Sequence, residues 1–225
     1  ISVFFKRCNL FKMNNKFEIK ICGINDEISM NAAINCKANY IGLVFYQNSP
    51  RNVSFNLCKK LLKLRNKFSK IVALTVNPKD DFLIKIKKIV KPDYLQLHGN
   101  ENLERCINIK KKVNIPLIKG INVKNKIDLF RTTREFEDIC DILLLDAPSE
   151  TLPGGNGNKF DWDILRGFKS QKKWMLAGGL NIDNIKNAID VTKAPAIDIS
   201  SGLEIRKGSK DPKLIEDFMF KCKNL

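Results

Sequence analysis

Short apolar runs alternate with amphipathic stretches along almost the whole chain. The apolar runs predict strands over 18–22, 40–45, 71–76, 93–97, 115–119, 142–146, 173–177 and 196–199. The amphipathic stretches predict helices near 26–37, 55–68, 79–90, 101–112, 124–137, 161–168, 182–190 and 211–222. Eight such units predict a single-domain α/β fold, the (β/α)8 or TIM barrel. An open doubly wound sheet is the alternative, and so regular a repeat favours it less.

The start of the chain and one long interruption mark the expected boundaries. The segment 1–16 precedes the first strand, and its short apolar run is followed by positive charges, unlike a signal peptide. We therefore expect 1–16 to be an N-terminal extension outside the fold and 17–225 to form the barrel. The longest irregular stretch, 147–159, is rich in proline and glycine. A loop of this length predicts a functional element such as a lid, with a loose insertion as the alternative.

Polar residues and glycines gather where most of the apolar runs end. Seven segments carry this pattern: Lys20-Ile21-Cys22-Gly23, Asn48-Ser49-Pro50-Arg51, Gln96-Leu97-His98-Gly99, Leu145-Asp146, Gly154-Gly155-Asn156-Gly157, Ala177-Gly178-Gly179-Leu180 and Asp198-Ile199-Ser200-Ser201-Gly202. The C-terminal ends of parallel strands meet at one end of a barrel, where such barrels build their active sites. The segments therefore predict a site at that end.

The order and composition of these segments resemble the phosphoribosylanthranilate isomerase family, over about residues 18–218. The resemblance implies a (β/α)8 barrel enzyme of tryptophan biosynthesis that needs no cofactor or metal. It implies an Amadori rearrangement, in which N-(5'-phosphoribosyl)anthranilate becomes 1-(2-carboxyphenylamino)-1-deoxyribulose 5-phosphate. The expected partner is therefore a small phosphosugar.

Two residues at strand ends are the candidates for proton transfer. A cysteine such as Cys22 is more often a small buried apolar residue, but the end of a barrel strand faces the active site. Asp146 follows four aliphatic residues. A carboxylate there is either functional or forms a helix N-cap or a hydrogen bond to the following loop. The resemblance implies that Cys22 is the general base and Asp146 the general acid. A thiolate base requires positive surroundings.

The remaining candidates are expected to bind the substrate. The planar guanidinium of Arg51 can grip a carboxylate with two hydrogen bonds, and the resemblance assigns it to the anthranilate carboxylate. Loops after the last two strands of such barrels commonly bind phosphate through backbone N–H groups. That role falls to Gly178, Gly179, Ser200, Ser201 and Gly202.

His98 and Asp198 complete the set. The resemblance places both near the substrate in a supporting role, in which Asp198 binds a hydroxyl group or orients a neighbour. His98 can equally be a structural histidine, and Gln96, two residues before it, shares its side of the strand.

Charge and cysteine usage narrow the class of protein. The chain carries 40 Lys and Arg against 24 Asp and Glu, a net charge of +16. Its lysines spread over predicted helix faces without interleaved aromatics, which favours a solvated surface over a nucleic-acid partner, although the field can attract an anionic substrate. Seven scattered cysteines without a CxxC motif, and a single histidine, argue against a disulfide framework and a zinc site. We expect a cytoplasmic protein without a membrane segment, either a monomer or a homodimer.

Two other functions remain open from the residues alone. One is another phosphosugar-binding barrel. Indole-glycerol-phosphate synthase would need a catalytic lysine and glutamates at strand ends, and the strand ends do not show that set. Ribulose-phosphate epimerase would need paired histidines for its metal, and the sequence has one histidine. The other is a non-catalytic barrel that binds phosphate or nucleic acid, against which the combination of Cys22, Asp146 and Arg51 argues.

Overall fold

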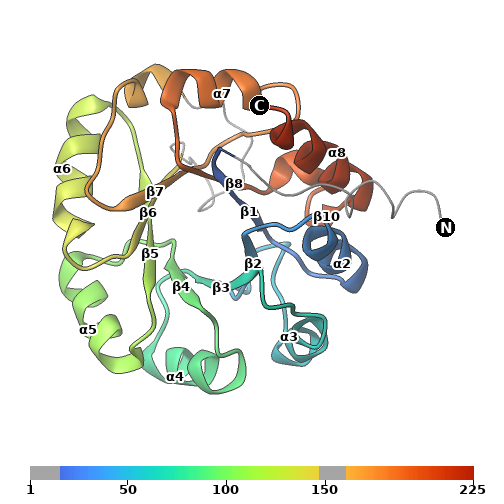
Figure 1. Ribbon diagram of the computed structural model, residues 1–225. Helices are drawn as coiled ribbons and strands as arrows, with labels where there is room; N and C mark the ends of the chain where they lie inside the picture. Colours follow the sequence, from blue (N-terminus) through green and yellow to red (C-terminus); the bar gives the residue numbers. More distant parts are fainter. Residues whose placement is uncertain (1–15, 147–160) are drawn as a thin grey trace.

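Within residues 16–146 and 161–225, which the computed structural model describes, eight parallel strands pair in chain order and close into a barrel (Figure 1). The strands are β1 (Glu18–Cys22), β2 (Tyr40–Val44), β3 (Lys70–Thr75), β4 (Tyr94–Leu97), β5 (Leu117–Asn122), β6 (Ile142–Asp146), β7 (Lys173–Leu176) and β8 (Ala196–Ile199). The barrel closes where β8 pairs with β1, with Glu18 opposite Ala196 and Ile21 opposite Ile199. The predicted (β/α)8 barrel is confirmed, and every predicted strand overlaps an observed one, although β5 begins and ends two to three residues later than the predicted 115–119.

Seven α-helices surround these strands in the described part of the chain. They are α2 (Glu27–Asn35), α3 (Phe55–Leu62), α4 (Asp80–Ile89), α5 (Leu103–Val113), α6 (Lys126–Glu137), α7 (Ile185–Thr192) and α8 (Pro212–Lys223). Most begin at a polar residue whose side chain accepts a hydrogen bond from the first turn; Asp26, Ser54 and Asn102 do so. Such caps stabilise a helix by about 1 kcal/mol each.

One predicted helix is not an α-helix. The stretch 161–168 forms only a short 3₁₀ helix, η1 (Trp162–Leu165). Arg166 already leaves the helical region with a ψ of 119°, and Gly167 follows with a φ of +72°. A left-handed glycine is a common way to end a helix, so the apolar periodicity over 161–168 overstated its length.

The continuous apolar runs are explained by two cores. Inside the barrel, side chains such as Tyr40, Val72 and Ile118 form one buried cluster. Their immediate neighbours on the strands, such as Ile41 and Leu117, belong to a larger cluster that also includes helix residues. Successive side chains of a strand point to opposite faces, so both faces must be apolar where both are covered.

A small hairpin after β8 has no counterpart in the predicted elements. Its strands are β9 (Glu204–Arg206) and β10 (Ser209–Lys210), and Gly208 turns between them with a φ of +84°. The hairpin packs on the loop after β2, because a Cβ added to Gly208 would lie 2.6 Å from the carbonyl oxygen of Pro50. It thus joins the end of the barrel repeat to the segment that carries Arg51.

Two sequence-based predictions fall mostly outside the described residues. They are the extension 1–16, of which 1–15 are not described, and the loop 147–159. Both remain predictions, although the core begins at Phe17, where the barrel domain was expected to start. No helix in the described ranges is long and apolar enough to cross a bilayer.

Candidate active site

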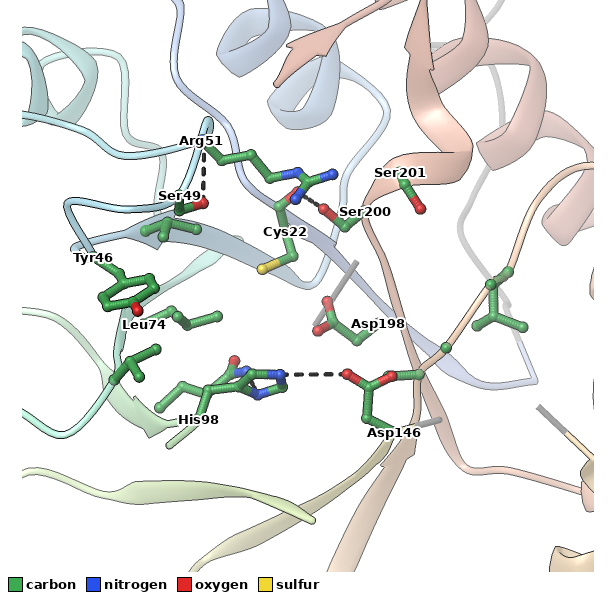
Figure 2. Close-up of a pocket in the computed structure, with 17 residues that line it drawn as sticks. Cys22, Tyr46, Ser49, Arg51, Leu74, His98, Asp146, Asp198, Ser200 and Ser201 are labelled. Carbon is green, nitrogen blue, oxygen red and sulfur yellow. Dashed lines mark hydrogen bonds and ion pairs between the residues drawn. The ribbon is translucent and has the colours of Figure 1, made fainter. Parts of the chain in front are cut away.

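A cavity opens at the C-terminal ends of the strands (Figure 2). Nine of the ten predicted site residues line it: Cys22, Arg51, His98, Asp146, Gly178, Gly179, Asp198, Ser200 and Ser201. The tenth, Gly202, lies behind them, where a Cβ would be 2.1 Å from the carbonyl oxygen of Leu180. Gly202 therefore allows the loop after β8 to pack on the loop after β7.

Cys22 ends β1 and directs its sulfur into the cavity, beside the apolar side chains of Val44 and Leu74 (Figure 2). Only 5% of the residue is exposed. Burial raises the pKa of the Cys22 thiol, and the charge of Asp198 raises it further, whereas Lys20 lowers it. At neutral pH these influences favour the thiol, while any thiolate that forms is a strong base.

Asp198 points into the same cavity from β8 and is held by a lysine inside the barrel. The Nζ of Lys20 lies 2.9 Å from Asp198 Oδ2, and Lys20 is fully buried. The other carboxylate oxygen, Oδ1, is buried without a hydrogen-bond partner among the described residues. Because an unpartnered buried oxygen is unfavourable, Oδ1 is well suited to accept a hydrogen bond from a ligand hydroxyl.

Asp146 is linked to Gln96 through His98. His98 Nε2 lies 3.3 Å from Asp146 Oδ2, and His98 Nδ1 lies 3.0 Å from Gln96 Nε2 (Figure 2). The amide nitrogen of Gln96 can only donate a hydrogen bond, so a neutral His98 accepts it at Nδ1 and carries its own proton on Nε2, toward Asp146. The imidazole lies against β5 because Gly120 has no side chain; a Cβ there would be 2.4 Å from Nδ1.

A buried ion pair outside the barrel wall fixes the loop that carries His98. Glu101 accepts hydrogen bonds from the backbone N–H groups of Asn77 and Gly99, at 2.8 and 3.0 Å. Lys119 on β5 pairs with Glu101 at 2.8 Å and also donates to the Gly99 carbonyl. The loops after β3 and β4 are therefore tied to each other and to β5. This network was not predicted from the sequence, where its local signal is a lysine within an apolar strand.

Arg51 forms an ion pair with Glu204, a residue that was not predicted from the sequence. Its Nε donates to Glu204 Oε1 at 2.6 Å and its Nη2 to Glu204 Oε2 at 2.8 Å, with both side chains nearly buried. An arginine has five N–H donors, so three still remain for a ligand. Lys210 pairs with the same carboxylate from β10. Glu204 therefore turns one edge of the guanidinium away from the cavity and leaves the other edge accessible.

The loops after β7 and β8 meet beside this group. Gly178 and Gly179 adopt φ values of +90° and +66°, a conformation that glycine reaches without strain. The Ser200 hydroxyl donates to the carbonyl oxygen of Cys22 at 3.1 Å, so it is tied to β1. Ser201 opens the short 3₁₀ helix η2 (Ser201–Leu203). The phosphate role predicted for these residues thus depends on backbone N–H groups more than on a long helix.

Comparisons with known proteins converge on one family. A family model described as N-(5'phosphoribosyl)anthranilate (PRA) isomerase matches residues 19–221. A Rhizobium rhizogenes protein named N-(5'-phosphoribosyl)anthranilate isomerase is 42% identical over 204 residues, which cover 89% of this chain and 91% of that protein.

Solved structures agree with the sequence match. Phosphoribosyl anthranilate isomerase from Thermotoga maritima superposes with a TM-score of 0.83 at 30% identity, covering 93% of this chain and 100% of that chain. A structure of phosphoribosyl anthranilate isomerase in complex with reduced 1-(o-carboxyphenylamino)-1-deoxyribulose 5-phosphate gives a TM-score of 0.80 at 30% identity, with the same coverage.

The tautomer of His98 can be tested directly, because it is the only histidine in the chain. Neutral His98 is expected to be protonated at Nε2 and unprotonated at Nδ1 in ¹⁵N NMR spectra. Gln96→Glu should move the proton to Nδ1 or charge the ring, because a carboxylate cannot donate to Nδ1. Protonation at Nδ1 in the unmodified protein would contradict the proposed hydrogen-bond direction.

Glu204 is expected to make the protein sensitive to acid. Burial alone would raise the pKa of Glu204, but hydrogen bonds from Arg51 and Lys210 and the charge of Lys210 lower it from 4.5 to about 2. The resulting stabilisation is complete above about pH 4.5 and is lost as the pH falls toward 2, by the order of 2 kcal/mol. Urea unfolding at the two ends of this range should show that Glu204→Gln removes this part of the pH dependence. Asp163→Asn, which alters an exposed pair, should leave it unchanged.

Proposed function

This chain belongs to the N-(5'-phosphoribosyl)anthranilate isomerase family, and we propose that Cys22 and Asp146 are the base and the acid of the reaction. The protein is the isomerase of tryptophan biosynthesis that converts N-(5'-phosphoribosyl)anthranilate to 1-(2-carboxyphenylamino)-1-deoxyribulose 5-phosphate. The observation that carries the residue assignment is the meeting of Cys22 from β1 and Asp146 from β6 in one cavity. Other phosphosugar or non-catalytic barrels lose their support, because the family match covers 19–221.

The proposed chemistry needs one proton donor and one proton acceptor. Protonated Asp146 gives its proton to the furanose ring oxygen while the bond from that oxygen to C1′ breaks, and the nitrogen lone pair forms an iminium group. The Cys22 thiolate then removes the C2′ proton, and the freed electron pair gives an enolamine, which tautomerises to the ketone. Positioned proton transfer of this kind accelerates a reaction by about 10²–10⁴-fold.

In this proposal the other site residues each bind a different group of the substrate. The accessible edge of Arg51 receives the anthranilate carboxylate, since three N–H donors remain after Glu204 is bound. The unpartnered Oδ1 of Asp198 accepts from a sugar hydroxyl. The phosphate lies at the backbone of Gly178, Gly179 and the loop after β8. The phosphosugar contacts, the cytoplasmic location and the monomeric or homodimeric state remain predictions.

Removing either proton-transfer group should lower kcat by at least about a hundredfold, because each supplies a positioned proton step. The variants are Cys22→Ala and Asp146→Asn, assayed by the loss of substrate fluorescence. Their dissociation constants for the reduced product analogue should stay near that of the unmodified protein. Cys58→Ala, at another buried cysteine on α3, is the matched control and should keep its kcat. A near-normal kcat in Cys22→Ala would refute the base assignment.

Arg51 should act on substrate binding. Arg51→Ala is expected to raise KM about ten- to a hundredfold, because a charge-assisted hydrogen bond contributes about 1.5–3 kcal/mol. Arg51→Lys should recover only part of the loss, since lysine lacks the two-pronged geometry. Arg65→Ala removes an arginine that pairs with Asp93 near the N-terminal end of β3, and it should leave KM unchanged. An unchanged KM in Arg51→Ala would rule out the carboxylate role.

A further inference from the structure

Lys20 is a buried charge that the proton transfers described above do not use. It lies on β1 two residues before Cys22, so both side chains point into the barrel from the same face of the strand. No part of Lys20 is exposed to solvent, which excludes a direct contact with substrate in the cavity. A lysine is almost never fully buried unless it is paired, and this one lies beside Asp198, which lines the cavity.

The neighbouring strand leaves room for the lysine and the thiol to meet. Gly42 on β2 is paired with Cys22 in the sheet. A Cβ added to Gly42 would lie 2.9 Å from the Cys22 sulfur and 3.3 Å from Lys20 Nζ. Both atoms therefore border the space that the missing side chain leaves. The ammonium group is held there from the other side by Asp198 on β8, at 2.9 Å.

Three charged groups from three strands act on Cys22. Lys20 on β1 and Lys210 on β10 favour its negative form, and Asp198 on β8 opposes it. β2 and β3 contribute the apolar side chains of Val44 and Leu74. Lys210 already pairs with Glu204, whereas Lys20 Nζ borders the same space beside Gly42 as the Cys22 sulfur.

We propose that Lys20 is a positioning residue for the base: its ammonium group, oriented by Asp198, stabilises the negative charge that Cys22 carries before it takes the C2′ proton. Lys20 keeps its own protons throughout, and the proton from C2′ moves only to the sulfur. Although burial lowers the pKa of Lys20, the charges of Asp198 and Cys22 outweigh it and raise the pKa, so the group stays charged. The proposal rests on the assignment of Cys22 as base.

The test is the rate at which iodoacetamide alkylates Cys22, followed by mass spectrometry of the Cys22 peptide over a range of pH. The rate reports the thiolate fraction, independently of turnover. Lys20→Met should slow alkylation at least about tenfold at each pH below the thiol pKa, and Asp198→Asn should speed it. Lys173→Met is the control, because Lys173 pairs with Glu18 at the N-terminal end of the barrel, away from the cavity; it should leave the rate unchanged.

Lys20→Met leaves Asp198 buried without its partner and can therefore fail to fold. The double variant Lys20→Met/Asp198→Asn leaves neither charge and should alkylate more slowly than Asp198→Asn alone. Equal rates in either comparison would overturn the proposal. The kcat profile of Lys20→Met should also shift to higher pH on its rising limb. If Cys22→Ala keeps its kcat, the base assignment fails, while an alkylation difference would still show that Lys20 acts on the sulfur.

Discussion

The pairing of β1 with β8 is the constraint on which the site depends. It joins the two ends of the barrel, so that Lys20 lies beside Asp198 although 178 residues separate them. The same closure brings the Ser200 hydroxyl to the carbonyl of Cys22. The pairing of β1 with β8 joins strands from the two ends of the chain. Without it, Cys22 and the residues of β8 would lie on opposite edges of an open sheet.

Three ion pairs buried near the mouth show what the site requires of the fold. They are Lys20 with Asp198, Lys119 with Glu101, and Arg51 with Glu204, whose carboxylate also pairs with the buried Lys210. A buried ion pair seldom stabilises a fold more than well-packed apolar residues of the same size would. The pairs fix instead where a carboxylate, a loop and a guanidinium lie. These buried ion pairs therefore lie near the mouth of the barrel, and the core beneath them is largely apolar.

The sequence predicted what depends on local periodicity and missed what depends on distant partners. All eight strands follow from apolar runs, and nine of the predicted site residues line one cavity because strand ends converge. The family resemblance supplied their roles, which periodicity does not contain. Glu204 could not be found this way, since it meets Arg51 across 153 residues and lies in a hairpin outside the repeat. The shortness of η1 was missed because apolar spacing does not reveal where a left-handed glycine ends a helix.

The hydrogen bond from Ser200 to the backbone of Cys22 has a consequence for how substrate binding and chemistry are coupled. The loop after β8 is one of the two that we assign to the phosphate, and it is tied through this bond to the residue that bears the sulfur. Binding energy from a remote, unreactive part of a substrate can be spent on alignment at the reacting atoms. In this protein, phosphate bound at the loop after β8 would help to hold Cys22 in position for proton transfer. A substrate without it would therefore react more slowly even when bound at saturation.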